Sequence, residues 1–355
     1  MNVIVGLGNT GTQIVKECAK SKLLTDESFF TIDSVCSMDM ADPKIVQIPI
    51  ISDDKSGSGR NRERGKAMFE YHYSLSKFDE MFLKCAESKL PVIVISSAAG
   101  GTGSGSITSF CEELIKNGID VIPIIVIPAD SDPTSYHMNT AELFFDLKSI
   151  EFNGSYCIFR NPPTSDYSAI NKSIVKTIEV LLGKYYNFTT SDSIDDSDLT
   201  NILSVPGRIV ASVSEGTDIH TVKKELTRAV LSGYQPAWST DDAEHTTSYV
   251  AESLTSKFAS KDFDEVFEDL NTSVGDTWER YKNISDIDES ETCIATIIIA
   301  GLPTVKAKNV TGSFNSAGDI AEGMNLANVK KPAFMTRKKA SVDKDSNGNM
   351  TFKWR

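Results

Sequence analysis

The sequence predicts an α/β fold with a parallel-sheet domain, a long central helix, a smaller mixed α/β domain and a C-terminal tail. Three observations support this fold class. Continuous apolar runs alternate with helical patterns over the first 160 residues, a long helical pattern follows them, and the order of elements changes after residue 207. Strands that are apolar at every position are typical of parallel sheets covered by helices on both faces.

The first region contains five apolar runs that we expect to be strands and three segments with helical spacing. The expected strands are residues 2–8, 28–35, 44–51, 90–98 and 119–129. The expected helices are residues 11–24, 62–88 and 106–118. The middle helix is expected to break once. Because the loops of interest follow strands, they should gather at the carboxyl edge of the sheet, where open α/β sheets bind ligands.

A long helix is expected next, over residues 166–187. Its apolar side chains at Ile170, Ile174, Ile178 and Leu181 share one face. A polar, acidic segment and a short helix follow it.

The remaining pattern indicates a second domain and then a tail. Its expected strands are residues 207–215 and 291–303. Its expected helices are residues 218–234, 248–258 and 262–278. We expect Trp278 and Tyr281 to pack on a helix there, and Met138 to lie in the first core. The predicted boundaries are residues 1–165 for the first domain, 166–190 for the central helix, 191–305 for the second domain and 306–355 for a partly disordered tail.

Composition limits the possible classes of protein. The chain of 355 residues is 40% hydrophobic and 24% charged, with a net charge of −13, as expected of a globular protein. An acidic surface repels nucleic acid and anionic membranes, so contact with either needs a local basic patch. The six cysteines include no CxxC pair, which favours reduced thiols in a cytoplasm. There is no signal-peptide pattern, and no apolar run approaches the roughly 18 residues of a membrane span. We therefore expect a cytoplasmic location and no membrane partner.

The first loop, Gly6–Gly11, reads GLGNTG and matches the GxGxxG pattern between a strand and a helix. A dinucleotide-binding fold also expects an acidic residue about 20 residues later, and Asp33 roughly meets that requirement. An NAD-dependent Rossmann oxidoreductase is therefore one alternative. It leaves a second glycine-rich loop unexplained.

That second loop, Gly100–Gly105, reads GGTGSG and directly follows an apolar strand. Glycines let successive backbone N–H groups converge on an anion, and the following helix N-terminus adds its dipole. A Walker A loop would carry a lysine, but no Lys or Arg lies between Lys89 and Lys116. Phosphate charge would then be met by backbone amides, Thr102, Ser104 and a metal ion. A third loop, Gly57–Ala67, joins glycines to four basic side chains and would close over a terminal phosphate.

These three loops resemble, in order and spacing, those of the tubulin and FtsZ superfamily. Residues 98–106 are similar to its glycine signature, Gly57–Gly65 to its γ-phosphate loop and Gly6–Gln13 to its first loop. The resemblance covers roughly residues 1–305 and implies a GTP-binding first domain. The nucleotide-binding residues that it implies in these loops are Gly8, Gly11, Thr12, Gln13, Gly57, Gly59, Asn61, Gly100, Gly101, Thr102, Gly103, Ser104 and Gly105.

Two further segments match the superfamily. Tyr167 and Asn171, four residues apart at the start of the central helix, stand where its members stack on guanine and hydrogen-bond to it. After that helix, Asp195 and Asp198 occupy the acidic positions of a catalytic loop, with Ser193 at the position usually held by Asn. The resemblance implies GTP hydrolysed to GDP with Mg²⁺, although no metal ligand is assigned. It also implies a head-to-tail filament in which each acidic loop completes the next subunit's site.

The departures from the pattern favour one branch. FtsZ usually carries a Glu and an Arg after the strand that matches residues 119–129; here no Arg follows, and Asp130 or Asp132 would serve the ribose. The HMN sequence in this stretch resembles TubZ of bacterial plasmids and phages, so the TubZ/PhuZ branch and a role in moving or positioning DNA are favoured. An FtsZ-like division filament, and a filament that barely hydrolyses its nucleotide, remain alternatives.

The tail carries a local basic patch on this acidic chain. The patch consists of Lys330, Lys331, Arg337, Lys338 and Lys339. By resemblance it would bind a DNA-bound adaptor or the neighbouring subunit, and the alternative is a solvated disordered tail.

Overall fold

The computed structural model describes residues 1–34, 42–51, 57–149, 155–186, 193–236, 248–274, 277–287, 292–302, 340–344 and 350–354. The strands in these residues are β1 (Val3–Leu7), β2 (Ser28–Asp33), β3 (Ile45–Pro49), β4 (Val92–Ser97), β5 (Val121–Ile127), β6 (Ser155–Arg160), β7 (Gly207–Gly216), β8 (Ser248–Ser256), β9 (Thr277–Asp286), β10 (Cys293–Leu302), β11 (Ala340–Lys344) and β12 (Met350–Trp354). The helices are α1 (Gly8–Lys20), α2 (Arg62–Ser74), α3 (Asp79–Ala86), α4 (Thr102–Lys116), α5 (Thr134–Ser149), α6 (Ser168–Leu181), α7 (Asp196–Leu203), α8 (Ile219–Ser232) and α9 (Ala259–Val274).

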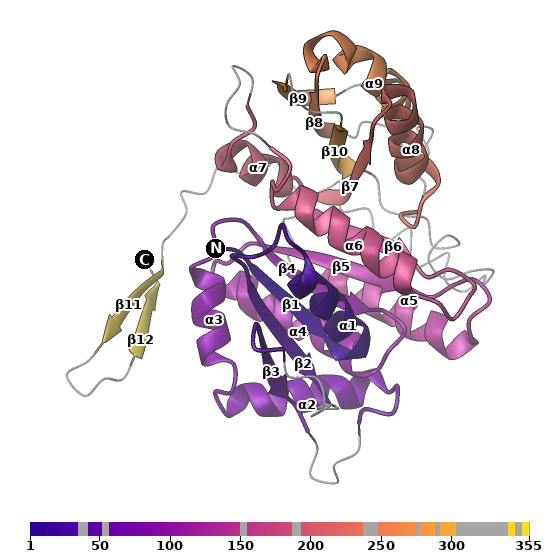
Figure 1. The fold of residues 1–355 in the computed structure, drawn as a ribbon. Coiled ribbons are helices and arrows are strands. Elements are labelled where there is room, and N and C mark those ends of the chain that lie inside the picture. The colour runs from indigo at the N-terminus through magenta and orange to yellow at the C-terminus, as the bar shows by residue number, and fades with distance from the viewer. Residues whose placement is uncertain are drawn as a thin grey trace.

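Ten of these strands form one sheet in the order β3-β2-β1-β4-β5-β6-β7-β10-β8-β9. The strands from β3 to β6 are parallel, as expected for the five predicted strands, and β6 is a further parallel strand that the sequence analysis did not predict. β7 joins β6 through a short parallel ladder, and β10 then runs antiparallel to both β7 and β8. The α/β fold with a first parallel region and a mixed second region is therefore confirmed, and Figure 1 shows the second region above the first, with α6 between them.

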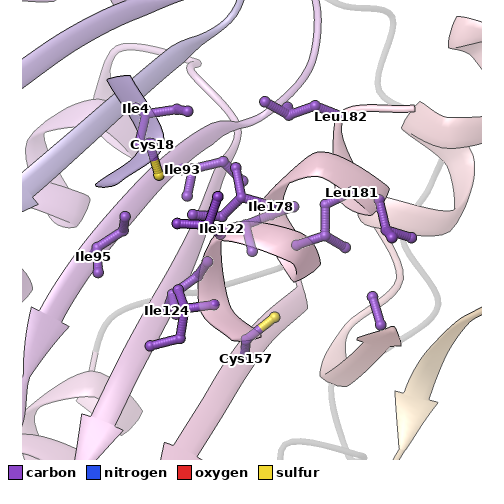
Figure 2. Packing of buried hydrophobic residues seen from close by; sticks show 14 of the residues in the cluster. Ile4, Cys18, Ile93, Ile95, Ile122, Ile124, Cys157, Ile178, Leu181 and Leu182 are labelled. Atoms are coloured by element: carbon purple, nitrogen blue, oxygen red, sulfur yellow. The ribbon is translucent and has the colours of Figure 1, made fainter. Parts of the chain in front are cut away.

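Both faces of the parallel region are buried. On β1 the side chain of Ile4 belongs to one apolar cluster and those of Val3, Val5 and Leu7 to another, because successive side chains point to opposite faces of a strand. Helices α1 and α6 cover the Ile4 face, while α2, α3, α4 and α5 cover the other. The residues that were expected to share a face of the central helix all belong to the first cluster, and Figure 2 shows Ile178 beside Ile122.

The second region has its own core. Apolar residues of α8 and α9 cover one face of β7, β10 and β8, in a cluster that includes Val222, Leu226, Phe263 and Phe267. Side chains on the opposite face, such as Ile298, join the cluster beneath α6. Helix α6 therefore packs against both parts of the sheet.

Several elements differ from the sequence prediction. Residues 248–258 were expected to be helical, but Ser248–Ser256 form strand β8, which lies between β10 and β9. Val250 and Leu254 are spaced as on a helix, yet both are buried on a strand, and the polar Glu252 and Ser253 between them are buried as well. The pattern was misleading because polar residues in a central strand look like the exposed face of a helix.

Smaller corrections concern single residues and bounds. Trp278 and Tyr281 belong to strand β9 rather than to a helix, and the Trp278 side chain is exposed. Met138 is 58% exposed on α5, so its expected place in the core is wrong. The long segment 62–88 does break once, between α2 and α3, as expected.

The described part of the tail consists of β11 and β12, which pair with each other as an antiparallel hairpin. The basic patch between Lys330 and Lys339 lies outside the described residues. The five cysteines in the described part of the chain are buried and form no disulfide, and Cys36 lies outside it. Among the described helices, none has the length and hydropathy of a membrane span.

Candidate functional site

A cavity of about 720 Å³ opens at the carboxyl ends of the parallel strands. Its wall is formed by the loops after β1, β2, β3, β4, β5 and β6 and by the starts of α1, α4 and α6. The predicted residues that line it are Gly8, Thr12, Gln13, Gly57, Gly59, Gly100, Gly101, Thr102, Gly103, Tyr167 and Asn171. The structure thus brings segments from the first loop and from the start of α6 into one cavity, as the topology of an open α/β sheet requires.

Helices α1 and α4 begin at this cavity without a side-chain cap, and so does α6, although the Asp166 carboxylate accepts from its Ser168 amide. Leu7 precedes α1 and Gly101 precedes α4, and neither side chain accepts a hydrogen bond from the first turn. By contrast, α2, α7 and α8 begin at Asn61, Asp195 and Asp218, whose side chains do cap them. Neither α1 nor α4 has an acidic residue in its first turn. Their free N–H groups and dipoles favour an anion in the cavity.

The glycines of the signature loop have two distinct roles. A Cβ on Gly103 would lie 2.6 Å from the carbonyl oxygen of Leu7, so Gly103 lets α4 start directly against the end of β1. A Cβ on Gly105 would lie 2.2 Å from the Arg62 carbonyl, so Gly105 allows α2 and α4 to pack closely. Gly100 has open space around it. Close packing therefore explains Gly103 and Gly105, whereas access for a ligand is the simpler account of Gly100.

Three hydroxyl groups join the loops that follow β2, β3 and β4. The Thr102 hydroxyl lies 2.8 Å from that of Ser34 and donates to that of Ser58 at 2.9 Å. All three residues are buried and line the cavity. The chain of hydroxyls fixes the relative positions of three loops that are far apart in sequence.

Helix α5 holds the third glycine loop against the second. The Asn139 side-chain amide donates to the carbonyl oxygens of Arg60 (3.1 Å) and Ala99 (3.0 Å). The Arg60 guanidinium lies 5.0 Å from the centre of the Tyr136 ring, in cation–π contact, and both residues line the cavity. Of the four basic residues in this loop, Arg60 is therefore the one that lines the cavity.

Arg62, in the same basic segment, points elsewhere. Its guanidinium pairs with Asp146 at 2.6 Å and with Glu142 at 3.5 Å, and it donates to the Ser104 carbonyl at 3.3 Å. Because the side chain is 5% exposed and its terminal nitrogens contact α4 and α5, it contributes to packing, although its Nε has no hydrogen-bond partner among the described residues. Of the four basic side chains in this loop, Arg62 thus serves packing, and closure of the loop over a phosphate stays a prediction.

The opposite end of the cavity carries the residues expected to hold a base. Tyr167 directly precedes α6 and is 42% exposed, and Asn171 lies one helical turn later. Of the two candidate ribose acids, Asp132 lines the cavity, whereas Asp130 pairs with Arg160 outside the lining. The ring of Tyr167 is therefore open to stack on a planar ligand.

Four predicted nucleotide-binding residues lie behind the wall. Gly11 packs against the carbonyl of Ile95, and the Asn61 side chain caps α2 by accepting from the Arg64 amide at 2.9 Å. The Ser104 hydroxyl donates to the Gly100 carbonyl, and Gly105 packs against α2. Direct ligand contact by Gly11, Asn61, Ser104 and Gly105 stays a prediction.

The two predicted catalytic acids lie outside this cavity, at the start of α7. The Asp195 carboxylate accepts from the Ser197 and Asp198 amides at 2.7 and 2.9 Å, and the Asp198 carboxylate accepts from the Asp195 amide at 3.2 Å. This is a reciprocal capping box. Within one subunit, the geometry orients these carboxylates but does not place them on the cavity wall.

Sequence reasoning missed several cavity residues. Tyr136, Asn161, Ser58 and Lys16 all line the wall but were not among the predicted binding residues. Lys16 had a usable signal, since it lies four residues after Thr12 and so on the same face of α1. The others depend on how loops from different strands converge, which spacing in the sequence does not reveal.

A metal ion would have few protein ligands here. Within the described residues, no group of three or more His, Cys, Asp or Glu side chains is arranged to hold one. The cavity does contain Asp33, Asp132 and the Thr102 hydroxyl. Because Mg²⁺ is often bound through phosphates with one or two carboxylates, these residues fit an ion carried by a nucleotide.

Comparison with known proteins identifies the fold. By sequence, neither a family model nor a curated protein matches the chain. By structure, it is similar to TubZ of Clostridium botulinum phage c-st, with 16% identity and a TM-score of 0.64 over 91% of this chain and 97% of that one. It is also similar to CetZ2 from Haloferax volcanii in a GTPγS-bound protofilament, with 18% identity and a TM-score of 0.67. That match covers 91% of this chain and 100% of that one. The similarity to an empty FtsZ dimer of M. jannaschii has 14% identity and a TM-score of 0.64, and it covers 84% of this chain and 87% of that one.

These likenesses show that the chain has the tubulin/FtsZ fold, with TubZ among its structural neighbours. The resemblance inferred from three glycine loops is therefore confirmed at the level of the fold.

Proposed function

We propose that this protein is a tubulin-like GTPase that assembles head-to-tail into filaments. One observation carries the proposal: a single cavity in a tubulin/FtsZ fold collects the lysine-free glycine loop, two uncapped helix N-termini and the pair Tyr167 and Asn171. Backbone N–H groups at one end suit a polyphosphate, and the Tyr167 ring at the other suits a purine base. The CetZ2 neighbour is described as bound to GTPγS, which supports GTP and GDP as ligands.

Hydrolysis requires a water molecule in line with the terminal phosphate and compensation of the charge that develops there. Mg²⁺ bound with GTP would supply part of that compensation, and Asp33 and Thr102 are the cavity residues suited to hold it. Asp195 and Asp198 would orient the water. Because they lie away from the cavity of their own subunit, we propose that they act on the nucleotide of the adjoining subunit.

Such a contact joins two different surfaces of identical subunits. An interface of this kind does not close on itself and therefore generates a filament. The CetZ2 structure is described as a protofilament, which supports self-association of this chain through the same fold. Moving or positioning plasmid or phage DNA, through an adaptor bound by the basic tail, is the finer proposal that similarity to the phage TubZ supports.

The first test is sedimentation and phosphate release across a range of protein concentrations, with GTP, ATP, NAD and a slowly hydrolysed GTP analogue. We expect pelleting with GTP and with the analogue, and phosphate release that rises only above the polymerisation threshold. Preferential binding of NAD would favour the oxidoreductase. Filaments without appreciable turnover would favour a structural filament.

A mixing experiment tests the shared active site. Asp198→Asn keeps an acceptor for the helix cap, while Asn171→Ala weakens the base contact, so each variant alone should lose most of its turnover. In an equal mixture, about one quarter of the interfaces would join an intact pocket to an intact acidic loop, which restores part of the activity. Asp196→Asn is the matched control, since the Asp196 carboxylate takes no part in the capping box. A mixture no more active than its components would contradict the proposal.

A further inference from the structure

Lys16 is a buried cation in the wall of the candidate nucleotide cavity. The residue is 8% exposed and lies on α1, which begins at the cavity. Lys20, one turn later, pairs with Glu17 at 2.7 Å on the exposed side of the helix, whereas Lys16 has no such partner among the described residues. Removing an ammonium group from water without a counter-ion is costly, so buried charges are normally paired. The Lys16 side chain is thus mostly buried in the cavity wall without a counter-ion among the described residues, where a bound anion would pair with it.

The Lys16 side chain extends toward the cavity. Side chains on a helix tilt toward its N-terminus, and for α1 that end is the first glycine loop. Thr12 lies one turn before Lys16 on the same face and also lines the cavity. The Thr12 hydroxyl oxygen is buried and has no hydrogen-bond partner among the described residues. The Thr12 hydroxyl and the Lys16 ammonium thus lie on one face of α1 without a partner among the described residues.

The position of the α1 face that carries Thr12 and Lys16 indicates which end of a bound nucleotide would lie beside it. Ala19 continues the row of Thr12 and Lys16, and its carbonyl accepts from Lys44, just before β3, at 3.3 Å. Thr31 on β2 and Gln47 on β3 line the cavity together with Thr12 and Lys16, so this row shares a wall with β2 and β3. In the sheet, β2 and β3 lie on the opposite side of β1 from β6, the strand before Tyr167 and Asn171.

From this placement we propose that the Lys16 ammonium binds the polyphosphate of the nucleotide. The lysine that is missing from the glycine loop would thus be supplied by α1. This inference rests on the proposed nucleotide-binding function and adds a direct phosphate ligand to it. Lys16 and Arg60 would then be the two cationic side chains at the phosphate end of the cavity.

The test is equilibrium binding by the full chain of a slowly hydrolysed GTP analogue, GDP and GMP. Lys16→Met should weaken binding of the triphosphate by about 10- to 100-fold, GDP by less and GMP least, because each lost phosphate removes part of the contact. Lys16→Arg should keep most of the affinity. Lys20→Met is the matched control, with the same loss of charge on the same helix but at an exposed site.

Two readouts are independent of hydrolysis. Without ligand, Lys16→Met should unfold at a temperature no lower than the wild type, because it removes an uncompensated buried charge. Inorganic tripolyphosphate should compete with the GTP analogue on the wild type and much less on Lys16→Met. Equal losses for all three nucleotides, or no loss, would overturn the role of Lys16. A wild type that binds tripolyphosphate but no guanine nucleotide would refute the proposed function and leave the anion site standing, whereas failure to bind tripolyphosphate would overturn the inference.

Discussion

The two parts of the ten-stranded sheet differ in how their strands are buried. In the parallel part, β1, β4 and β5 carry apolar side chains on both faces, and glycines allow the covering helices to approach. In the mixed part, β8 lies next to the edge strand β9 and buries Glu252 and Ser253. The Ser253 hydroxyl accepts a hydrogen bond from Asn283 on β9 at 2.8 Å, and Glu252 pairs with Arg280 at 3.2 Å.

This difference shows that the same depth of burial is reached by two routes. The parallel part depends on close packing, so its stability should be most sensitive to added side-chain volume. The mixed part depends on paired polar groups, so its stability should be most sensitive to changes of charge and pH. Three substitutions test the comparison, from the largest expected effect to the smallest.

Gly105→Ala should have the largest effect. The added methyl would lie 2.2 Å from the Arg62 carbonyl and 2.7 Å from the Lys66 amide, so α2 and α4 must separate. We expect a loss of about 3 kcal/mol or more in the free energy of unfolding, measured with denaturant in the absence of nucleotide. Gly100→Ala is the control, because a Cβ there meets nothing within 4 Å. Equal losses for the two variants would show that close packing does not distinguish these glycines.

Glu252→Gln should have an intermediate effect that depends on pH. Burial raises the pKa of Glu252 from 4.5 to about 7, while Arg280 and Lys282 oppose the shift. A folded-state pKa above the unfolded value stabilises the protein below about pH 4.5, and this contribution is lost as pH rises through about 7. At pH 8 the variant should therefore be more stable than the wild type, by at most about 3 kcal/mol.

Unfolding measured at pH 5 and pH 8 checks this prediction. The gain in stability should be large at pH 8 and small at pH 5. Glu279→Gln on the exposed side of β9 is the control and should show no such dependence. If Glu252→Gln is destabilising at both values, the pair with Arg280 matters more than the burial of the charge.

Asp195→Ala should have the smallest effect, at the junction between the two parts. It removes the acceptor of two amide hydrogen bonds at the start of α7, which costs about 1 kcal/mol. Asp196→Ala should change stability by less than about 0.5 kcal/mol, because its carboxylate is not in the capping box. Thermal unfolding of both variants measures the difference. A larger loss for Asp196→Ala would mean that the cap is not what holds this turn.

The sequence by itself determined five of the parallel strands and the glycine loops that follow three of them, but it did not reveal β6. Continuous apolar runs leave few alternatives to a covered strand, and a glycine at Gly103 or Gly8 marks a backbone that cannot carry a side chain. Tyr167 and Asn171 were singled out by the resemblance to the tubulin superfamily, and the structure places both in the cavity wall.

Only the tertiary structure decided which residues share the cavity and which polar residues are buried. Lys16 reads as an ordinary exposed lysine until α1 is placed against β2 and β3. Glu252 reads as a solvated residue until β10 and β9 flank its strand and Arg280 pairs with it. The physical reason is that burial depends on elements that are distant in sequence, and for Glu252 the compensating charge is distant as well. A local pattern therefore cannot indicate it.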